Sequence, residues 1–235
     1  MNKITVCFSP TMLAQYEHKD SVVVVTDVFR ATTTMCVAFS NGCKEIIPVA
    51  TEDEAKDYKN KGYLVGAEKE TERCVFADFG NSPAEYYAEK VKGKTIVMKT
   101  TNGTVAINGA KDCHSLLIGA FVNLNAVAQK CKELNRDVLI VCSGQNLNIS
   151  LEDSLFAGAL TSLLQEADFF IVQDDARIAL TLWQQARNRL RKFAVQGEHA
   201  QRLIRHGFEK DMDICLSQST LDIVPVLKEN KLIIE

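Results

Sequence analysis

The feature that most constrains the fold is a series of short apolar runs rich in β-branched residues, each followed by a segment with helical spacing. The run VVVVT (22–26) has no polar alternation, which is typical of a strand buried on both faces. Strands that alternate with helices predict a three-layer α/β/α fold with a largely parallel or mixed central sheet. The runs lie at 3–8, 22–27, 45–49, 62–66, 94–100, 115–120 and 137–143.

Two helix starts carry recognisable signals. In NSPAEYYAEKV (81–91), Ser82 can cap the helix, Pro83 fits its first position and Glu85 completes a capping box. In SLEDSLFAGAL (150–160), Ser150 can cap a helix whose small residues 157–159 allow close packing against a neighbour.

From residue 174 the pattern becomes continuously helical apart from a break near Gly197, and two strands follow at 222–227 and 231–235. No linker rich in Gly, Ser or Pro precedes this region. We therefore expect the helical C-terminal region to pack on the same domain, so that residues 1–235 form a single α/β domain.

Composition excludes several classes of partner. The net charge is −3 and hydrophobic residues make up 46%, which favours neither a nucleic-acid nor a membrane partner. The apolar runs are too short to cross a bilayer, and the N-terminal residues lack the apolar run of a secretion signal. We expect a cytoplasmic protein.

The eight cysteines are scattered, with no pair at C-x-x-C spacing. They are expected to be free thiols in a reducing compartment, and mostly part of the core. A nucleophilic cysteine is the alternative, and Cys36 and Cys142 are its candidates because both lie beside predicted loops.

The first candidate site follows the four valines. In open parallel sheets the ligand crevice lies outside the carboxyl ends of the strands, where Asp27 is expected. Arg30 follows, and Thr32 and Thr33 begin a helix whose free N–H groups and dipole favour an anion. The stretch predicts a site for a cation and a phosphate-like anion, although Asp27 could also be an ordinary helix cap.

Three other stretches support a phosphate site. The strand end at 98–104 is followed by small polar residues that can approach an anion, and we expect this loop to lie beside 26–34. The third strand end has a Ser-Gly turn followed by two acids, which could also serve only the helix dipole. The long connection 66–83 adds two carboxylates. Carboxylates with hydroxyl and amide donors indicate magnesium-assisted phosphate chemistry. The residues are Thr100, Thr101, Asn102, Gly103 and Thr104; Ser143, Gly144, Glu152 and Asp153; and Glu68 and Asp78.

Six motifs occur in an order that resembles the 2-phosphosulfolactate phosphatase family, the phosphatases of coenzyme M biosynthesis. They are DVFRATTT (27–34), FGNSP (79–83), TTNGT (100–104), CSG (142–144) with SLEDSLFAGA (150–159), GFEKD (207–211) and VPVL (224–227). The resemblance implies a three-layer α/β enzyme that hydrolyses 2-phospho-3-sulfolactate, or a related phosphorylated hydroxy acid, to sulfolactate and phosphate with Mg²⁺. Mn²⁺ is a possible substitute.

Residue by residue, the resemblance implies catalytic roles for Asp27, Arg30, Glu152 and Asp153. The metal would be held by Asp27 with one or more of Glu68, Asp78, Glu152 and Asp153. The match is imperfect at GAEKE (66–70), where Lys69 replaces an arginine that could grip a sulfonate or carboxylate with two donors. The native substrate is therefore left open between 2-phospho-3-sulfolactate and related phosphorylated hydroxy acids.

Attack by a metal-activated water is favoured over a phospho-aspartyl intermediate. Phe29 stands where the DxDx(T/V) pattern of haloacid dehalogenases has its second aspartate. His199 and His206 are seven residues apart and are expected on a solvated helix face, with contact between His199 and an acidic substrate as the alternative.

Two other function classes compete. A non-catalytic binding module for a phosphorylated organic acid would show no magnesium-dependent phosphate release. A dinucleotide-binding oxidoreductase is disfavoured because no G-x-G-x-x-G follows the early strands. Many enzymes of this kind form dimers, so a homo-oligomer is expected.

Overall fold

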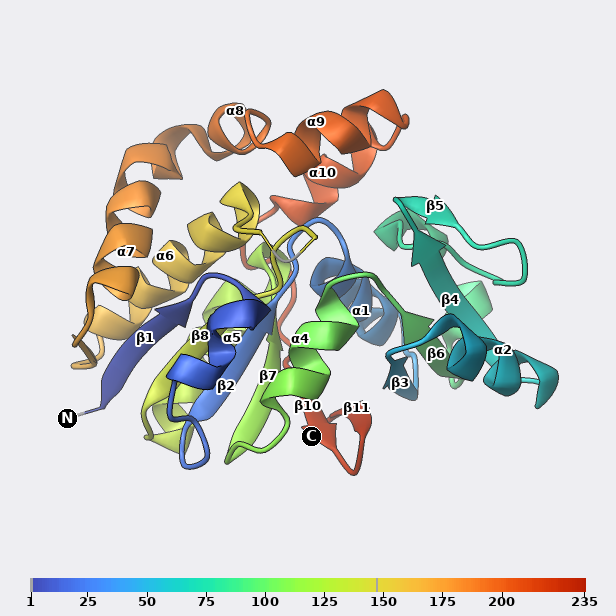
Figure 1. Ribbon diagram of the computed structural model, residues 1–235, viewed down its shortest axis with the longest axis horizontal. Coiled ribbons are helices and arrows are strands. Elements are labelled where there is room, and N and C mark those ends of the chain that lie inside the picture. The colour runs from blue at the N-terminus through green and yellow to red at the C-terminus, as the bar shows by residue number, and fades with distance from the viewer. Residues whose placement is uncertain (1, 147) are drawn as a thin grey trace.

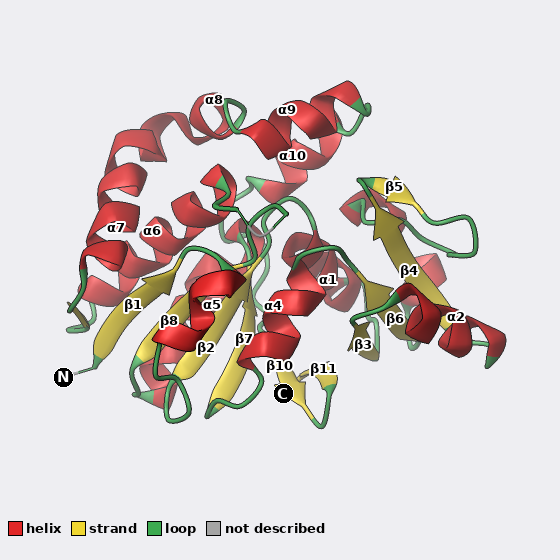
Figure 2. Ribbon diagram, viewed as in Figure 1, coloured by secondary structure: helices red, strands yellow, loops and turns green. Residues whose placement is uncertain are grey.

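The computed structural model describes residues 2–146 and 148–235. Within these residues, eleven strands form one mixed sheet in the order β5-β4-β6-β3-β11-β10-β7-β2-β8-β1-β9 (Figures 1 and 2). All nine strands that the sequence predicts are present, and the predicted α/β class is confirmed. The strands are β1 (Lys3–Cys7), β2 (Val22–Thr26), β3 (Glu45–Val49), β4 (Leu64–Lys69), β5 (Glu72–Arg73), β6 (Thr95–Lys99), β7 (Ser115–Gly119), β8 (Val138–Cys142), β9 (Phe170–Ile171), β10 (Pro225–Lys228) and β11 (Lys231–Ile234).

The sheet consists of two groups of parallel strands joined by an antiparallel hairpin. Strands β7, β2, β8, β1 and β9 form one parallel group, and β3, β6 and β4 form the other. The hairpin β10–β11 lies between them, with Val226 paired to Leu117 of β7 and Leu232 paired to Ile46 of β3. The two parallel groups therefore meet in the sheet through residues late in the sequence.

Helices cover both faces of the sheet. In β2, Val22 and Val24 belong to the core beneath α5, α6 and α7, whereas Val23 and Val25 belong to the core beneath α1 and α4. Four consecutive valines are explained by this two-sided burial, since neighbouring strand residues point to opposite faces. The helices are α1 (Ala31–Ser40), α2 (Glu52–Asn60), α3 (Ala88–Val91), α4 (Gly103–Ala110), α5 (Leu124–Leu134), α6 (Leu151–Gln165), α7 (Asp174–Ala186), α8 (Leu190–Ala194), α9 (Glu198–Arg205) and α10 (Glu209–Cys215).

The C-terminal helices extend the same structure. Figure 1 shows α7 beside α6, and α8, α9 and α10 above the carboxyl ends of the strands. Gly158 of α6 makes the α6–α7 contact possible, because a Cβ there would lie 2.0 Å from the carbonyl oxygen of Ala179. The predicted close packing at residues 157–159 is confirmed, as is the helix break at Gly197. The predicted continuity on either side of that break is wrong, because a 3₁₀ turn, Arg187–Arg189, follows α7, and residues 206–208 separate α9 from α10.

The capping box predicted at residues 82–85 is wrong. A 3₁₀ turn, Pro83–Glu85, replaces the start of a long helix. The Ser82 hydroxyl donates to Asp211 Oδ1 (2.7 Å), and Glu85 Oε2 accepts from the Gly80 N–H (2.8 Å). Both side chains are used in other contacts, so the helix starts later, as the short α3. Ser150 stands at the N-cap of α6 but its side chain makes no capping hydrogen bond.

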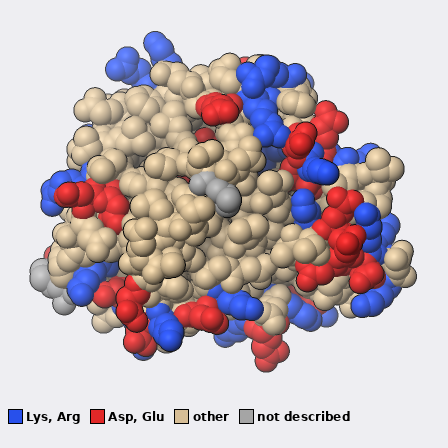
Figure 3. Space-filling view, viewed as in Figure 1, with Lys and Arg blue, Asp and Glu red and all other residues tan. Residues whose placement is uncertain are grey.

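The described surface carries charges of both signs. Figure 3 shows Lys and Arg interspersed with Asp and Glu around one face, with an uncharged region at its centre. No helix in the described residues has the length and apolar character needed to cross a bilayer. All eight cysteines are free, as predicted. Burial raises the pKa of Cys36 and of Cys142 well above the ordinary thiol value, so neither suits a nucleophile.

Candidate active site

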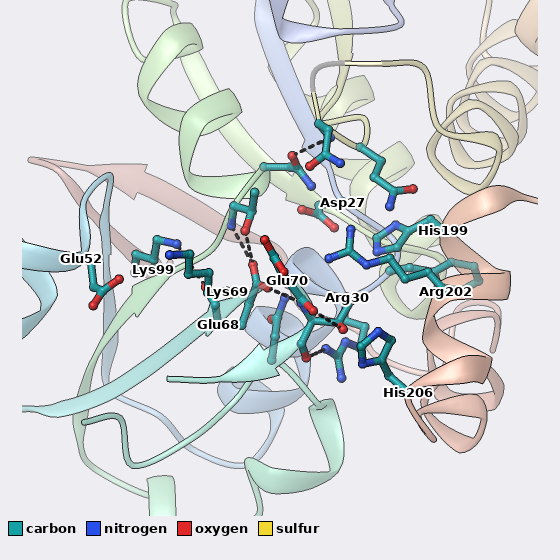
Figure 4. A pocket seen from close by; sticks show the side chains of 17 residues that line it. Asp27, Arg30, Glu52, Glu68, Lys69, Glu70, Lys99, His199, Arg202 and His206 are labelled. Atoms are coloured by element: carbon teal, nitrogen blue, oxygen red, sulfur yellow. Dashed lines mark hydrogen bonds between the residues drawn. The ribbon is translucent and has the colours of Figure 1, made fainter. Parts of the chain in front are cut away.

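A pocket of about 640 Å³ lies at the carboxyl ends of the strands, beneath α9 (Figure 4). Its walls come from the β2–α1, β4–β5, β6–α4 and β8–α6 connections and from the C-terminal helices. The described lining residues are Asp27, Phe29, Arg30, Glu52, Glu68, Lys69, Glu70, Thr71, Asn81, Lys99, Thr101, Asn102, Gln145, Asn146, His199, Arg202 and His206.

Asp27 lies at the carboxyl end of β2 and is 5% exposed. Its Oδ1 accepts from the Ala31 N–H (3.4 Å), while Oδ2 has no hydrogen-bond donor in the described residues. Burial raises the pKa of Asp27 to about 6, the charge of His199 opposes this, and the charges of Glu68 and Glu152 add to it. This carboxylate is thus held in an environment that favours a bound cation.

The two loops expected to be neighbours do meet. A Cβ at Gly103 would lie 3.0 Å from both Asp27 Oδ2 and the Ala31 Cβ. The start of α4 therefore approaches the Asp27 carboxylate closely, and glycine is the residue that permits this distance. The predicted juxtaposition of loops 26–34 and 99–104 is confirmed.

The hydroxyls of Thr32 and Thr33 do not line the pocket. Thr32 Oγ1 donates to the Asp27 carbonyl (2.9 Å), and Thr33 Oγ1 donates to the Val28 carbonyl (3.0 Å). Both side chains are completely buried. Their hydrogen bonds stabilise the turn that leads into α1, so the structure gives them a supporting position instead of the predicted contact with phosphate.

The second threonine cluster lies only partly in the pocket. Thr100 Oγ1 accepts from the Thr104 N–H (3.1 Å), and Thr104 Oγ1 donates to the Thr100 carbonyl (2.8 Å). These two bonds close the first turn of α4 and leave both residues outside the lining. Thr101 and Asn102 are the members of this cluster that border the pocket, whereas Gly103 lies directly behind them.

Glu68 lies at the carboxyl end of β4 and is 7% exposed. Its Oε1 accepts from the N–H and the hydroxyl of Thr101 (both 2.8 Å), and its Oε2 accepts from the Thr71 N–H (3.1 Å). Lys99 Nζ donates to the Glu68 carbonyl (3.1 Å). Glu68 therefore joins the β4–β5 turn to the β6–α4 loop and faces the same pocket as Asp27.

The two acids at the start of α6 lie behind the pocket. Asp153 Oδ1 accepts from the Val28 N–H (2.8 Å), and Oδ2 accepts from the Gly144 N–H (3.0 Å). Burial, together with the charges of Glu152 and Asp27, raises the pKa of Asp153 well above its ordinary value. Asp153 clamps the β2–α1 loop to the β8–α6 loop and does not line the pocket.

Glu152 is 1% exposed and contacts α9. Its Oε1 lies 2.8 Å from His199 Nδ1, and its Oε2 has no partner in the described residues. Oε2 lies near Gly197, at the start of α9. The prediction of a solvated His199 is therefore wrong, because α9 folds back over the strand ends and leaves only 11% of this side chain exposed.

The Ser143–Gly144 turn shapes the loop behind the site. The Ser143 N–H donates to the Thr26 carbonyl (2.8 Å), and the Ser143 hydroxyl is buried without a partner in the described residues. Gly144 has φ of +66°, and a Cβ there would lie 2.2 Å from the Asn148 carbonyl oxygen. Neither residue lines the main pocket, so their expected contact with phosphate stays a prediction.

Asp78 is not brought to the site. Its carboxylate accepts from Lys59 Nζ and from the Val65 N–H, and it does not line the pocket. Glu68 lines the pocket and Asp78 does not, so the two acids of the 66–83 connection do not share the site. Asp78 stabilises the connection that carries Glu68, and the structure gives no support to it as a metal ligand.

Arg30 is buried to 2% exposure and already has partners. It donates to Asp211 Oδ2 (2.9 Å) and to the Thr71 carbonyl (2.7 Å), and its guanidinium stacks 4.1 Å above the Phe208 ring. Arg30 thus joins α10 and the β4–β5 turn around one side of the pocket. The motif GFEKD contains Asp211, which is the sequence signal that could have identified this partner.

Sequence reasoning missed several residues of the pocket. Arg202 has no side-chain partner in the described residues, and Figure 4 shows it on the same side of the pocket as His199 and Asp27. Lys69 and Lys99 lie on the other side of the pocket, beside Glu68. A strand-end search could have found Lys99, because it closes β6. Nothing local distinguishes Arg202 from the other arginines of the C-terminal helices.

No three His, Cys, Asp or Glu side chains in the described residues converge as a preformed metal cage. Asp27 and Glu68 nevertheless both face the pocket with carboxylate oxygens, and Asp27 Oδ2 lacks a donor. Mg²⁺ usually takes one or two carboxylates together with water and substrate phosphate. These two residues fit that pattern of binding.

A family model described as 2-phosphosulpholactate phosphatase matches residues 7–230. The chain belongs to the 2-phosphosulfolactate phosphatase family. Relatives named probable 2-phosphosulfolactate phosphatase include one from Thermotoga petrophila, 40% identical over 87% of this chain and 88% of the relative. Another, from Carboxydothermus hydrogenoformans, is 39% identical over 99% and 97%, and one from Clostridium beijerinckii is 32% identical over 99% and 100%. The chain is thus an enzyme of the phosphoric monoester hydrolase class.

Proposed function

We propose that the enzyme hydrolyses 2-phospho-3-sulfolactate, or a closely related phosphorylated hydroxy acid, to the hydroxy acid and phosphate, with Mg²⁺ as cofactor. The names of its relatives support this substrate. The observation that carries the proposal is the layout of the pocket. A buried carboxylate, Asp27, lies with Arg202 and His199 on one side of the pocket, and Lys69 and Lys99 lie on the other (Figure 4).

This layout suits a short substrate with an anionic group at each end. We assign the phosphate to the side of Asp27 and Arg202, because Arg202 has no side-chain partner in the described residues and can grip two phosphoryl oxygens. The sulfonate or carboxylate then lies against Lys69 and Lys99. Arg30 supports this arrangement from behind, since Asp211 and the Thr71 carbonyl already accept from it.

The charge balance supports the cofactor. The described lining contains four acids and four lysines or arginines, and one of those arginines, Arg30, is already paired with Asp211. A substrate with phosphate, carboxylate and sulfonate groups would therefore add anionic charge that the side chains do not neutralise. Asp27 and Glu68 are the residues that would hold Mg²⁺, and the bound ion supplies charge neutralisation at the phosphoryl group.

The chain itself positions the reacting groups. The Thr101 hydroxyl and N–H hold Glu68, and the close approach at Gly103 sets the distance between α4 and Asp27. With a pKa raised to about 6 by burial, Asp27 is ionised at neutral pH and can orient an attacking water by accepting a hydrogen bond from it. Arg202 stabilises the charge that spreads over the phosphoryl oxygens in the transition state.

The test is a phosphate-release assay with purified enzyme and 2-phospho-3-sulfolactate, 2-phospholactate or para-nitrophenyl phosphate, each with Mg²⁺ or with excess EDTA. We expect the highest kcat/KM for the sulfonated substrate, loss of activity with EDTA, and recovery with Mg²⁺ or Mn²⁺. Full activity after exhaustive EDTA treatment would refute the cofactor. Binding of these phosphorylated acids without release of phosphate would instead indicate a non-catalytic binding module.

A further inference from the structure

We propose that His199 donates a proton to the leaving-group oxygen and that Glu152 is the residue that positions it. This assignment rests on the proposed phosphatase function and adds a catalytic group to it. It concerns the half of the reaction that charge neutralisation at phosphorus does not address, namely the departure of an alcohol oxygen.

The position of His199 is the first argument. The residue lies near the start of α9, and its ring borders the pocket on the same side as Asp27 (Figure 4). The ring is 11% exposed and meets the Phe29 ring edge-on, with centroids 6.2 Å apart and an interplanar angle of 77°. A partly enclosed imidazole held in one orientation is suited to transfer a proton to a bound substrate.

The second argument is the hydrogen bond behind the ring. Glu152 Oε1 lies 2.8 Å from His199 Nδ1, and an ionised carboxylate can only accept. With Glu152 ionised, Nδ1 carries a proton in both charge states of the ring. Nε2 has no partner in the described residues, so it is the nitrogen that gains and loses a proton within the pocket.

The electrostatics agree with this geometry. Burial lowers the pKa of His199, but the hydrogen bond and charge of Glu152, with the charge of Asp27, outweigh burial and leave the pKa raised. Arg30 opposes the rise. Glu152 is 1% exposed, so the partner of the ring is itself enclosed by the fold.

The chemistry needs such a donor. Water forms the new bond to phosphorus, and the bond between phosphorus and the secondary alcohol oxygen breaks with both electrons on that oxygen. An alkoxide is a poor leaving group, so the Nε2 proton passes to it and the free hydroxy acid departs. The attacking water loses one proton to solvent and the ring regains one from solvent. The net reaction consumes one water and produces the alcohol and phosphate.

The discriminating experiment compares two leaving groups. The His199→Asn variant is assayed with the alkyl phosphate 2-phospho-3-sulfolactate and with para-nitrophenyl phosphate, whose nitrophenolate departs without a proton. We expect kcat with the alkyl phosphate to fall by roughly 100-fold or more, the usual contribution of general acid catalysis, and kcat with the aryl phosphate to change little. Equal losses for both substrates, or no loss for the alkyl phosphate, would overturn the assignment.

Two further variants complete the design. Glu152→Gln keeps an acceptor oxygen at Nδ1 but removes the charge. Its loss of kcat should be smaller and should again fall mainly on the alkyl phosphate; equal losses of kcat for both substrates would refute the positioning role. It also carries the test if His199→Asn does not fold. His114→Asn, outside the pocket, is the matched control and should not alter either rate. If the native enzyme releases no phosphate from the alkyl substrate, the proposed function itself fails.

Discussion

Replacing Asp27 by asparagine should make the enzyme inactive and, in the absence of metal, more stable. Asparagine has nearly the same shape, and its side-chain oxygen can still accept from the Ala31 N–H as Asp27 Oδ1 does (3.4 Å). The substitution removes a negative charge that is buried beside Glu68 and Glu152. Turnover should fall by about 100-fold or more, as when one positioned electrostatic group is lost.

The gain in stability follows from the pKa of Asp27. Burial raises this pKa from the ordinary 3.8 to about 6, so above pH 6 the folded protein holds a charge that the unfolded chain accommodates more easily. At 1.36 kcal/mol per pH unit the difference is about 3 kcal/mol. Below pH 3.8 the carboxyl group is protonated in both the folded and the unfolded state, so burying it carries no charge penalty. The native protein therefore loses about 3 kcal/mol of stability as the pH rises from 3.8 to about 6.

Urea unfolding in EDTA at pH 8 and at pH 4 measures this difference directly. The Asp27→Asn variant should be more stable than the native protein at pH 8, and the gap should shrink towards zero at pH 4. The matched control is Asp78→Asn, which removes a carboxylate paired with Lys59 outside the pocket. It should retain turnover and lose a little stability. A variant of Asp27 that keeps normal turnover, or is destabilised equally at both pH values, would refute the reasoning.

Three other substitutions test separate parts of the site. Gly103→Ala should lower kcat with little change in fold, because its Cβ would press on Asp27 Oδ2 at 3.0 Å; an unchanged kcat would contradict that contact. Asp211→Asn should destabilise the protein by about 3 to 5 kcal/mol in urea unfolding, because it leaves the buried Arg30 charge unpaired; a loss below 1 kcal/mol would argue against this pairing. Lys99→Ala should raise KM for 2-phospho-3-sulfolactate about tenfold but not KM for para-nitrophenyl phosphate. An equal rise in both KM values would contradict the proposed orientation of the substrate.

The fold could be predicted from the sequence because its signals are local. Each strand run is short and rich in β-branched residues, and β2 has apolar residues on both faces, which only a covered sheet explains. The two-residue strands β5 and β9 were not predicted, because two residues are too few to show a hydrophobic period. The place of the β10–β11 hairpin between β7 and β3 depends on contacts more than 100 residues apart, which no local pattern contains.

The site was predicted less completely because a side chain's role depends on its hydrogen-bond partner. Thr32 and Thr101 look equivalent in the sequence, yet Thr32 donates to its own turn while Thr101 holds Glu68 in the pocket. Asp27 and Glu68 could be found as acids near strand ends. His199 was only the less favoured alternative and Arg202 was not found, since their helix looks like a solvated one until α9 is seen to cross the strand ends.

The position of the β10–β11 hairpin has a consequence for the order in which the enzyme can form. Residues 225–234 are synthesised after both parallel groups of strands, and they supply the pairing that joins those groups within the sheet. A nascent chain on the ribosome can thus complete each group while the two still lack their common seam. The pocket takes Asp27 from one group and Glu68 and Lys99 from the other, so the two halves of the site are joined within the sheet after residues 225–234 have paired.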